Sequence, residues 1–193
     1  MQQTWQNLKI LGFVVLLLLA VHGVNVLLDG ALLQFGIIPR VDNAWFHIFT
    51  APFIHGSWQH LFNNIAGIIV FSVLCMARGI RFYLVASFFI IAFSGVLVWL
   101  FGRSAIHMGA SGWVFGLWSL TISLAFFDRS FVSILTAVFV ALFYGGMIYG
   151  VLPQDPRISF EAHLFGAAAG VFVAFVYGRS LKVNAQSNKV KNR

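Results

Sequence analysis

Six long runs of apolar residues constrain this chain more than any other feature of its sequence. Of its 193 residues, 60% are hydrophobic and only 9% are charged, whereas a soluble domain carries about a quarter charged residues. In lipid, the backbone satisfies its polar groups only within a helix or a closed barrel, so each run is predicted to be a helix. The chain is therefore expected to be a polytopic membrane protein, and a water-soluble domain is excluded.

The lengths of the runs predict the fold class. We expect an all-α polytopic membrane protein in which six transmembrane helices form one domain over residues 1–193. The predicted spans are residues 10–28, 60–76, 82–101, 111–127, 131–149 and 161–178. A cleaved signal peptide is the alternative for the first run. That run is long, however, and Ala20-Val21-His22 is a poor cleavage site, so a retained helix is favoured.

The distribution of lysine and arginine predicts how the helices are oriented. With the N-terminus in the cytoplasm, nine of the 12 basic residues lie on the inner side, including those of a basic tail at residues 182–193. The outer loops hold only Arg40, Arg103 and Arg157. The positive-inside rule therefore places both termini on the cytoplasmic side of the plasma membrane. We expect this membrane to be a bacterial inner membrane. Since topology explains the net charge of +7, the lipid bilayer is the expected partner and nucleic acid is not.

Polar residues begin three of the predicted spans on the same side of the membrane. His60 and Asn64 open the second span, Ser111 opens the fourth and His163 opens the sixth. Because an even number of crossings separates these starts, all four residues are expected at a similar shallow depth near the outer face. Polar groups inside a membrane are costly and usually have a partner, so we predict that Ser111 pairs with His163.

Ser111 has the surroundings that a nucleophilic serine needs. It lies between Gly109 and Gly112, which let the backbone turn tightly. A serine hydroxyl needs a base, and the unpaired N–H groups of a helix start can stabilise an oxyanion beside it. The alternative is a simple helix N-cap, a position that serine also favours.

His163 is the candidate base, and the alternative is a hydrogen-bonded packing residue. Glycines spaced by four residues allow two membrane helices to approach closely, so packing is their direct role in either case. They are Gly112 and Gly116 in the fourth span, and Gly166 and Gly170 in the sixth. Glu161 should face the opposite side of the helix, so we expect a dyad in which the packing of the last helix orients the imidazole.

His60 and Asn64 are four residues apart, so they share one helix face and both can donate hydrogen bonds to an oxyanion. Polar capping of a helix start is the alternative. His55 and His60 are five apart, which argues against a metal pair, and the chain contains no His-Glu-x-x-His motif. Neither a metal nor another cofactor is expected.

These residues resemble the rhomboid family of intramembrane serine proteases. The matching segments occur in the family's order within a six-span frame, so the resemblance covers nearly the whole chain. They are Thr50–His55, His60–Asn64, Gly109–Gly112 and Ala162–Gly166 with Gly170.

The resemblance implies a rhomboid-like bundle and assigns roles to its residues. Ser111 would be the nucleophile and His163 the general base. His60, Asn64 and the Ser111 N–H would form the oxyanion hole. The fifth span and the loop at 151–160 would form a mobile gate. The substrates would be single-span membrane proteins, cleaved within or beside their transmembrane segments.

Three departures from the family's pattern stand out. Phe46-His47 replaces a Trp-Arg pair that helps brace the first outer loop, and Phe115 replaces a tyrosine that some members place against the histidine. A glutamate common late in the second span is missing. None of these changes removes a proton-transfer group, so activity is expected.

Other function classes make different predictions. A catalytically silent rhomboid-like protein that binds client helices would not react with a fluorophosphonate probe. A small transporter would carry charged or broken helices at the membrane midplane, whereas these spans carry almost no charge. A metal hydrolase would lose activity with a chelator rather than with a serine-directed inhibitor.

Overall fold

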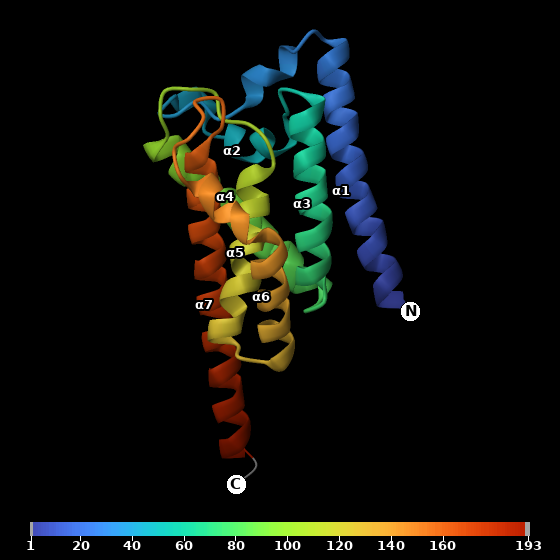
Figure 1. The fold of residues 1–193 in the computed structure, drawn as a ribbon, viewed down its shortest axis with the longest axis vertical. Helices are drawn as coiled ribbons and strands as arrows, with labels where there is room; N and C mark the ends of the chain where they lie inside the picture. The colour runs from blue at the N-terminus through green and yellow to red at the C-terminus, as the bar shows by residue number, and fades with distance from the viewer. Residues whose placement is uncertain (1, 192–193) are drawn as a thin grey trace.

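The computed structural model describes residues 2–191 and is built from helices (Figure 1). Within these residues the only β pairing is a single bridge between Ile37 and His107, so the predicted all-α class is confirmed. The elements in chain order are α1 (Gln2–Leu27), η1 (Ala31–Phe35), η2 (Asp42–Ala44), α2 (His47–Thr50), η3 (Ala51–Phe53), α3 (Trp58–Met76), α4 (Ile80–Phe101), α5 (Ser111–Phe127), α6 (Phe131–Tyr144), η4 (Gly145–Val151) and α7 (Phe160–Lys191).

Every predicted span contains a helix, but the count of six membrane crossings remains a prediction. Five segments of the described chain are long and apolar enough to span a bilayer. They are Gln3–Leu27, Trp58–Met76, Ile80–Phe101, Phe131–Val151 and Phe160–Leu181. The other predicted span is α5, which has 17 residues and is shorter than the rest.

Three boundaries differ clearly from the prediction. α7 continues as a helix to Lys191, well beyond the predicted end of the sixth span at residue 178. α1 begins at Gln2 rather than near residue 10, because its leading Gln, Lys and Leu residues are good helix formers that extend the apolar run. The fifth span was expected to be one helix to residue 149, but α6 ends at Tyr144. The chain then tightens into the 3-10 helix η4, beginning at Gly145-Gly146, where glycine weakens α-helical continuation.

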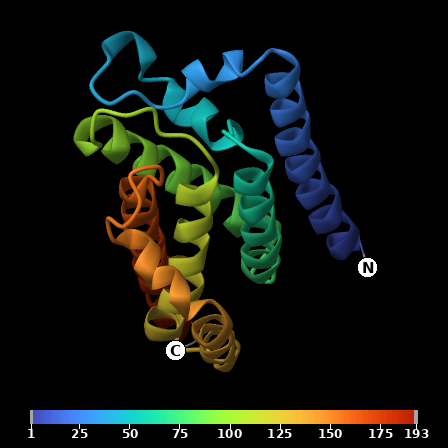
Figure 2. The same ribbon diagram turned by 45° about the horizontal axis from the view of Figure 1, so that its top comes forward.

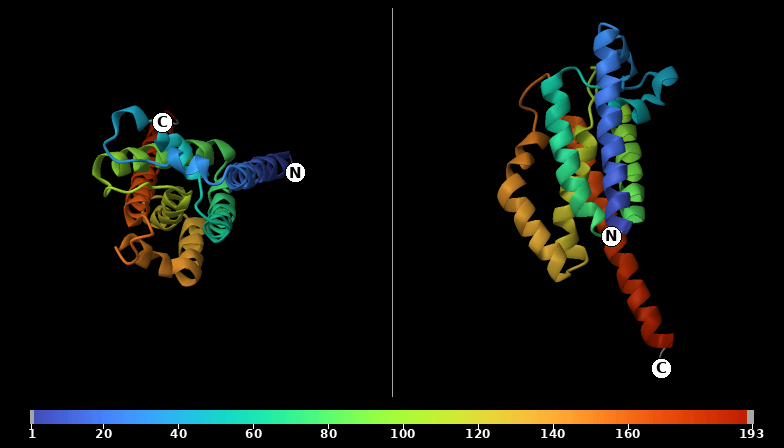
Figure 3. Two further views of the ribbon diagram at one scale, coloured as in Figure 1. Left: turned by 90° about the horizontal axis from the view of Figure 1, so that it is seen from above. Right: turned by 90° about the vertical axis from the view of Figure 1, so that its right-hand side faces the viewer.

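α5 lies at the centre of the bundle, among α3, α4, α6 and α7 (Figure 3). Its residues 112–121 are all buried, which agrees with a sequence that is apolar on every side. α1 stands at the edge of the molecule, packed mainly on α3 (Figure 2). The helix that carries Ser111 is therefore the one most enclosed by protein.

Glycines set the close contact between α5 and α7. A methyl group added to Gly166 would collide with the carbonyl group of Gly112, and one added to Gly170 would collide with that of Gly116. The two backbones therefore touch, as small residues permit between membrane helices. This contact fixes the position of the first turn of α7 relative to the first turn of α5.

α3, α5 and α7 all begin at the end of the molecule that carries the connection from η1 to η3 (Figure 1). Three polar side chains brace this connection. His47 Nδ1–H donates to the Gly36 carbonyl over 2.9 Å, and Thr50 Oγ1–H donates to the Phe35 carbonyl over 2.7 Å. Arg40 Nη1 donates to the Gly102 carbonyl over 2.9 Å, which ties the connection to the end of α4.

Candidate active site

Ser111 is the first residue of α5, and its side chain does not cap the helix. The N-cap position is Ala110, which makes no side-chain capping bond, so the simple N-cap interpretation of Ser111 is wrong. Gly109 has a φ of 105°, a conformation that L side chains rarely adopt, and its N–H donates to the Ala51 carbonyl over 2.9 Å. This turn presents Ser111 and the N–H groups of the first turn of α5.

His60 and Asn64 lie against that turn. A Cβ atom added to Gly109 would lie 2.5 Å from His60 Nε2 and 3.2 Å from Asn64 Nδ2. His60 does not cap α3, because Ser57 is the N-cap and its Oγ accepts the His60 N–H over 3.2 Å. The capping interpretation of His60 and Asn64 is therefore wrong. The buried Asn64 Nδ2 has no hydrogen-bond partner among the described residues, so its N–H groups are available to a ligand in the site.

His163 is held by two groups from outside α7. Its side chain is 8% exposed, and its ring stacks on Phe115 with centroids 4.0 Å apart and planes within 6°. Its Nδ1 lies 2.9 Å from the Gly150 carbonyl of η4. A carbonyl oxygen can only accept, so Nδ1 carries the proton and Nε2 keeps its lone pair. The stack on Phe115 belongs to the packing of α7 against α5, and η4 adds a hydrogen bond that the sequence did not predict.

Ser111 and His163 lie in the first turns of α5 and α7, the two helices that approach closely through their glycines. Phe115 follows Ser111 by one helical turn and therefore shares its face, and Phe115 is the residue that covers His163. On the other side, Gly112 faces the Ala162 carbonyl, at 3.1 Å from an added Cβ. No direct hydrogen bond joins Ser111 to His163 in the described structure. Apo catalytic contacts are often loose and tighten when substrate binds.

His55 supports the serine turn, a role that sequence reasoning missed. Its imidazole is fully buried, and its Nε2 accepts the Ala110 N–H over 3.4 Å. Its ring meets His60 edge-on at 5.0 Å between centroids, and His22 Nδ1–H donates to its carbonyl over 3.1 Å. Burial first, and then the neighbouring His60, lower the pKa of His55 to about 4, so the ring stays neutral and can accept.

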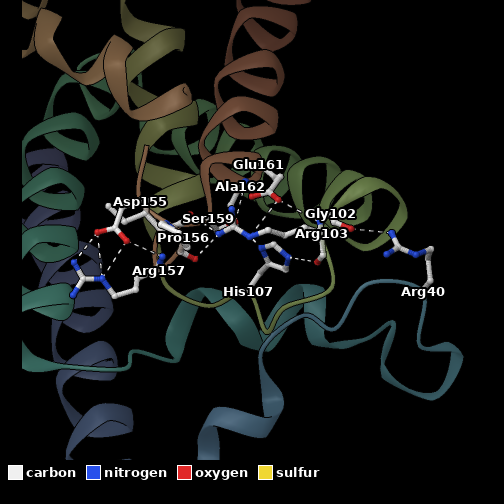
Figure 4. Close-up of polar contacts among 11 residues, drawn as sticks. Arg40, Gly102, Arg103, His107, Asp155, Pro156, Arg157, Ser159, Glu161 and Ala162 are labelled. Carbon is white, nitrogen blue, oxygen red and sulfur yellow. Dashed lines mark hydrogen bonds and ion pairs between the residues drawn. The ribbon is translucent and has the colours of Figure 1, made fainter. Parts of the chain in front are cut away.

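A polar network at the same end of the molecule ties the start of α7 to the loop before α5 (Figure 4). Arg103 Nη2 donates to the carbonyls of Pro156 and Ile158 over 2.9 and 2.7 Å. Its backbone N–H donates to Glu161 Oε1 over 3.3 Å, and Glu161 makes no hydrogen bond to His163 in the described structure.

Ser159 and His107 extend this network. Ser159 Oγ accepts the Ala162 N–H over 3.2 Å and donates to His107 Nδ1 over 2.6 Å. His107 Nε2–H in turn donates to the Arg103 carbonyl over 3.0 Å (Figure 4). These bonds anchor the first turn of α7, directly before His163.

A metal centre has no ligand set in the described part of the chain, where no three His, Cys, Asp or Glu side chains are grouped to hold an ion. The candidate site provides the Ser111 hydroxyl, the His163 imidazole and several hydrogen-bond donors. This set suits acyl transfer to serine.

Residues 42–180 match the rhomboid domain family. That match covers more than half of the chain, so the protein belongs to the rhomboid family, and it is an integral membrane protein. Members of this family are generally serine intramembrane proteases, so membership supports a protease-like function.

Relatives occur in bacteria and plants, and the two plant proteins are named as rhomboid-like. An uncharacterised protein of Mycobacterium bovis is 33% identical over 177 residues, covering 86% of this chain and 73% of that protein. Rhomboid-like protein 11, chloroplastic, of Arabidopsis thaliana is 29% identical over 152 residues, covering 70% of this chain and 54% of that protein. RHOMBOID-like protein 4 of the same plant is 32% identical over 146 residues, covering 72% of this chain and 35% of that protein.

Proposed function

We propose that this protein is an intramembrane serine endopeptidase that uses Ser111 as nucleophile and His163 as general base. The observation that carries the proposal is the clamped imidazole, with its ring on Phe115 and its Nδ1–H on the Gly150 carbonyl. This arrangement selects one tautomer and leaves Nε2 free to accept a proton. A serine at the adjacent helix start is the group that such a base would activate.

The reaction follows from these groups. His163 Nε2 takes the Ser111 proton while Ser111 Oγ attacks a peptide carbonyl. The developing oxyanion accepts hydrogen bonds from Asn64 Nδ2, from the His60 ring and from the Ser111 N–H. The protonated His163 gives its proton to the leaving amine, which leaves an acyl-enzyme. Water, activated by the same imidazole, then hydrolyses the ester and restores Ser111.

The substrates are single-span membrane proteins cleaved within or beside the span. An intact transmembrane helix uses its carbonyls in its own hydrogen bonds, so the cleaved segment needs a locally helix-breaking sequence. The site lies where α3, α5 and α7 begin, at the end that positive charge assigns to the outer face. With bacterial relatives, a bacterial inner membrane is the proposed location.

The test compares variants of the purified protein in liposomes that contain a tagged single-span substrate. Ser111→Ala and His163→Ala are expected to abolish cleavage, and Ser111→Ala is expected to abolish labelling by a fluorophosphonate probe. Ser104→Ala is the matched control, because Ser104 is exposed in the loop before α5. Cleavage that persists in Ser111→Ala would falsify the mechanism. Wild-type protein that resists the probe and leaves substrates intact would instead identify a silent rhomboid-like binding protein.

A further inference from the structure

An apolar groove of about 320 Å³ runs between α4 and α7, on the part of these helices remote from the candidate site. Its walls are Phe82, Val85 and Phe89 of α4, facing Phe172, Val176 and Tyr177 of α7. Phe89 stacks on Phe172 with centroids 5.5 Å apart, and Phe82 meets Tyr177 at 4.5 Å. The groove is open along one side, so a chain lying in the surrounding lipid can enter it.

Two arginines flank one end of this groove. Arg81 directly precedes Phe82, and Arg179 directly precedes Ser180, which also lines the groove. By helical register, Arg81 shares an edge with Val85, and Arg179 shares an edge with Val176. Both side chains are exposed, and neither belongs to the lining of the groove, so each arginine lies beside the groove and reaches its opening only through its long, flexible side chain.

Neither arginine is neutralised within the part of the chain that the structure describes. Arg179 rests its guanidinium 5.3 Å from the Phe175 ring, and no ion pair is formed by it or by Arg81. The nearby Arg78 differs, because Asp128 pairs with it over 2.7 Å. An uncompensated pair of positive charges therefore stands beside an apolar slot.

We propose that the groove between α4 and α7 binds one anionic phospholipid, with an acyl chain along the aromatic walls and the phosphate between Arg81 and Arg179. Basic pockets between membrane helices bind anionic head groups in this way, and burial of the acyl chain adds affinity. A second copy of this chain fits the groove less well, since it would bring its own Arg81 and Arg179 against these two. The site is distinct from the candidate active site and does not depend on the proposed protease function.

Native mass spectrometry of the detergent-purified, delipidated full chain tests the proposal. Phosphatidylglycerol and phosphatidylcholine with the same acyl chains are titrated against the Ser111→Ala protein, so that proteolysis plays no part. We expect one phosphatidylglycerol to bind more tightly than phosphatidylcholine, and Arg81→Gln and Arg179→Gln each to weaken it about fivefold. Val85→Trp, at an exposed wall position, fills the groove and is expected to weaken both lipids.

Arg129→Gln is the matched control, since Arg129 is an exposed arginine at the same end of the bundle but on the turn between α5 and α6. Its phosphatidylglycerol binding should equal that of the parent protein. Equal weakening by Arg129→Gln would show diffuse attraction to charge and overturn the proposal. So would equal binding of the two lipids, displacement by inorganic phosphate, or a dimer that Val85→Trp dissociates. Each variant is first checked for an unchanged unfolding temperature.

Discussion

At the scale of single residues, the histidines divide into those already engaged and one left free. The chain has six, and five of them use a ring nitrogen in a hydrogen bond to another part of the described chain. These five are His22, His47, His55, His107 and His163. The ring of His60 makes no such bond within residues 2–191, although it lies against Gly109. That ring is therefore available to a substrate oxyanion.

Replacement of His60 should affect the reaction far more than the fold. His60→Ala is expected to lower kcat by about 10²-fold or more, because one oxyanion donor is lost, while KM and the unfolding temperature change little. Cleavage kinetics in liposomes and thermal unfolding of the same preparation measure both. A loss of stability equal to that of a core truncation would show that His60 is structural.

Phe115 should be needed for its flat ring. Phe115→Leu removes the surface on which His163 stacks, so we expect kcat to fall by about 10²-fold through misplacement of the base. Phe115→Tyr keeps the ring and should retain activity. Cleavage kinetics of the two variants decide the matter, and similar loss in both would mean that the stack does not position His163.

His55 should make the stability of the protein depend on pH. Its folded pKa of about 4 lies below the ordinary 6.5, so between these values the unfolded chain binds a proton that the folded chain does not. Stability should therefore fall as the pH drops through this window, by on the order of 3 kcal/mol in total. Unfolding midpoints at pH 7.5 and 5 should differ less in His55→Gln, whose amide oxygen can still accept the Ala110 N–H. Parallel curves for the two proteins would contradict this role.

At the scale of elements, the contact between α5 and α7 determines how the two residues of the candidate dyad are placed relative to each other. Ser111 and His163 each lie in the first turn of their helix, and the glycines that follow let those turns meet. η4 completes the arrangement from a third direction through the Gly150 carbonyl. Movement of η4 would therefore release the imidazole, which couples the segment expected to act as a gate to the orientation of the base.

Gly166→Val should separate these helices. The added side chain meets the Gly112 backbone, which cannot yield without moving α5, so we expect loss of cleavage and a clearly lowered unfolding temperature. Gly12→Ala in α1 is the control, because no atom lies within 4 Å of its added Cβ. That variant should be as active as the parent, and slightly more stable through its helix propensity. An active, stable Gly166→Val protein would show that this close approach is dispensable.

At the scale of the whole molecule, arginines serve different purposes at the two ends. The three on the predicted outer side are engaged in the loops: Arg40 and Arg103 donate to backbone carbonyls, and Arg157 pairs with Asp155 over 2.8 Å. At the opposite end, Arg81 and Arg179 are exposed and form no ion pair within the described chain. The three arginines of the predicted outer side are therefore engaged within the protein, whereas Arg81 and Arg179 form no ion pair within the described residues.

This charge distribution predicts the orientation of the protein in the membrane. A reporter enzyme active only outside the cytoplasm should be active when fused in the loop after Arg103 and inactive when fused after Arg129. Expression of both fusions in a bacterial host, with equal protein levels, measures this. Reversed activities would place the candidate site at the cytoplasmic face.

Much of the helical framework was predictable because a bilayer imposes it. The apolar run beginning at Ser111 coincides with α5, since the backbone of such a run must bond internally. Counting crossings also predicted that His60, Asn64, Ser111 and His163 would gather at one end. Helix ends were less predictable where polar helix formers extend α1, or where Gly145-Gly146 converts α6 to η4. These depend on local propensity rather than on lipid.

The sequence alone predicts which residues form the candidate site, their order along the chain and their similar depth in the membrane. It can do so because hydrophobicity and helical period are local properties. The sequence does not predict which groups hold the His163 ring in place. The Gly150 carbonyl that bonds to His163 is a backbone group, and so is the Ala110 N–H that bonds to His55. No sequence pattern marks such groups. Such groups acquire a role only when distant segments are packed together, so the tautomer of the imidazole and the support of the serine turn emerge from the assembled bundle alone.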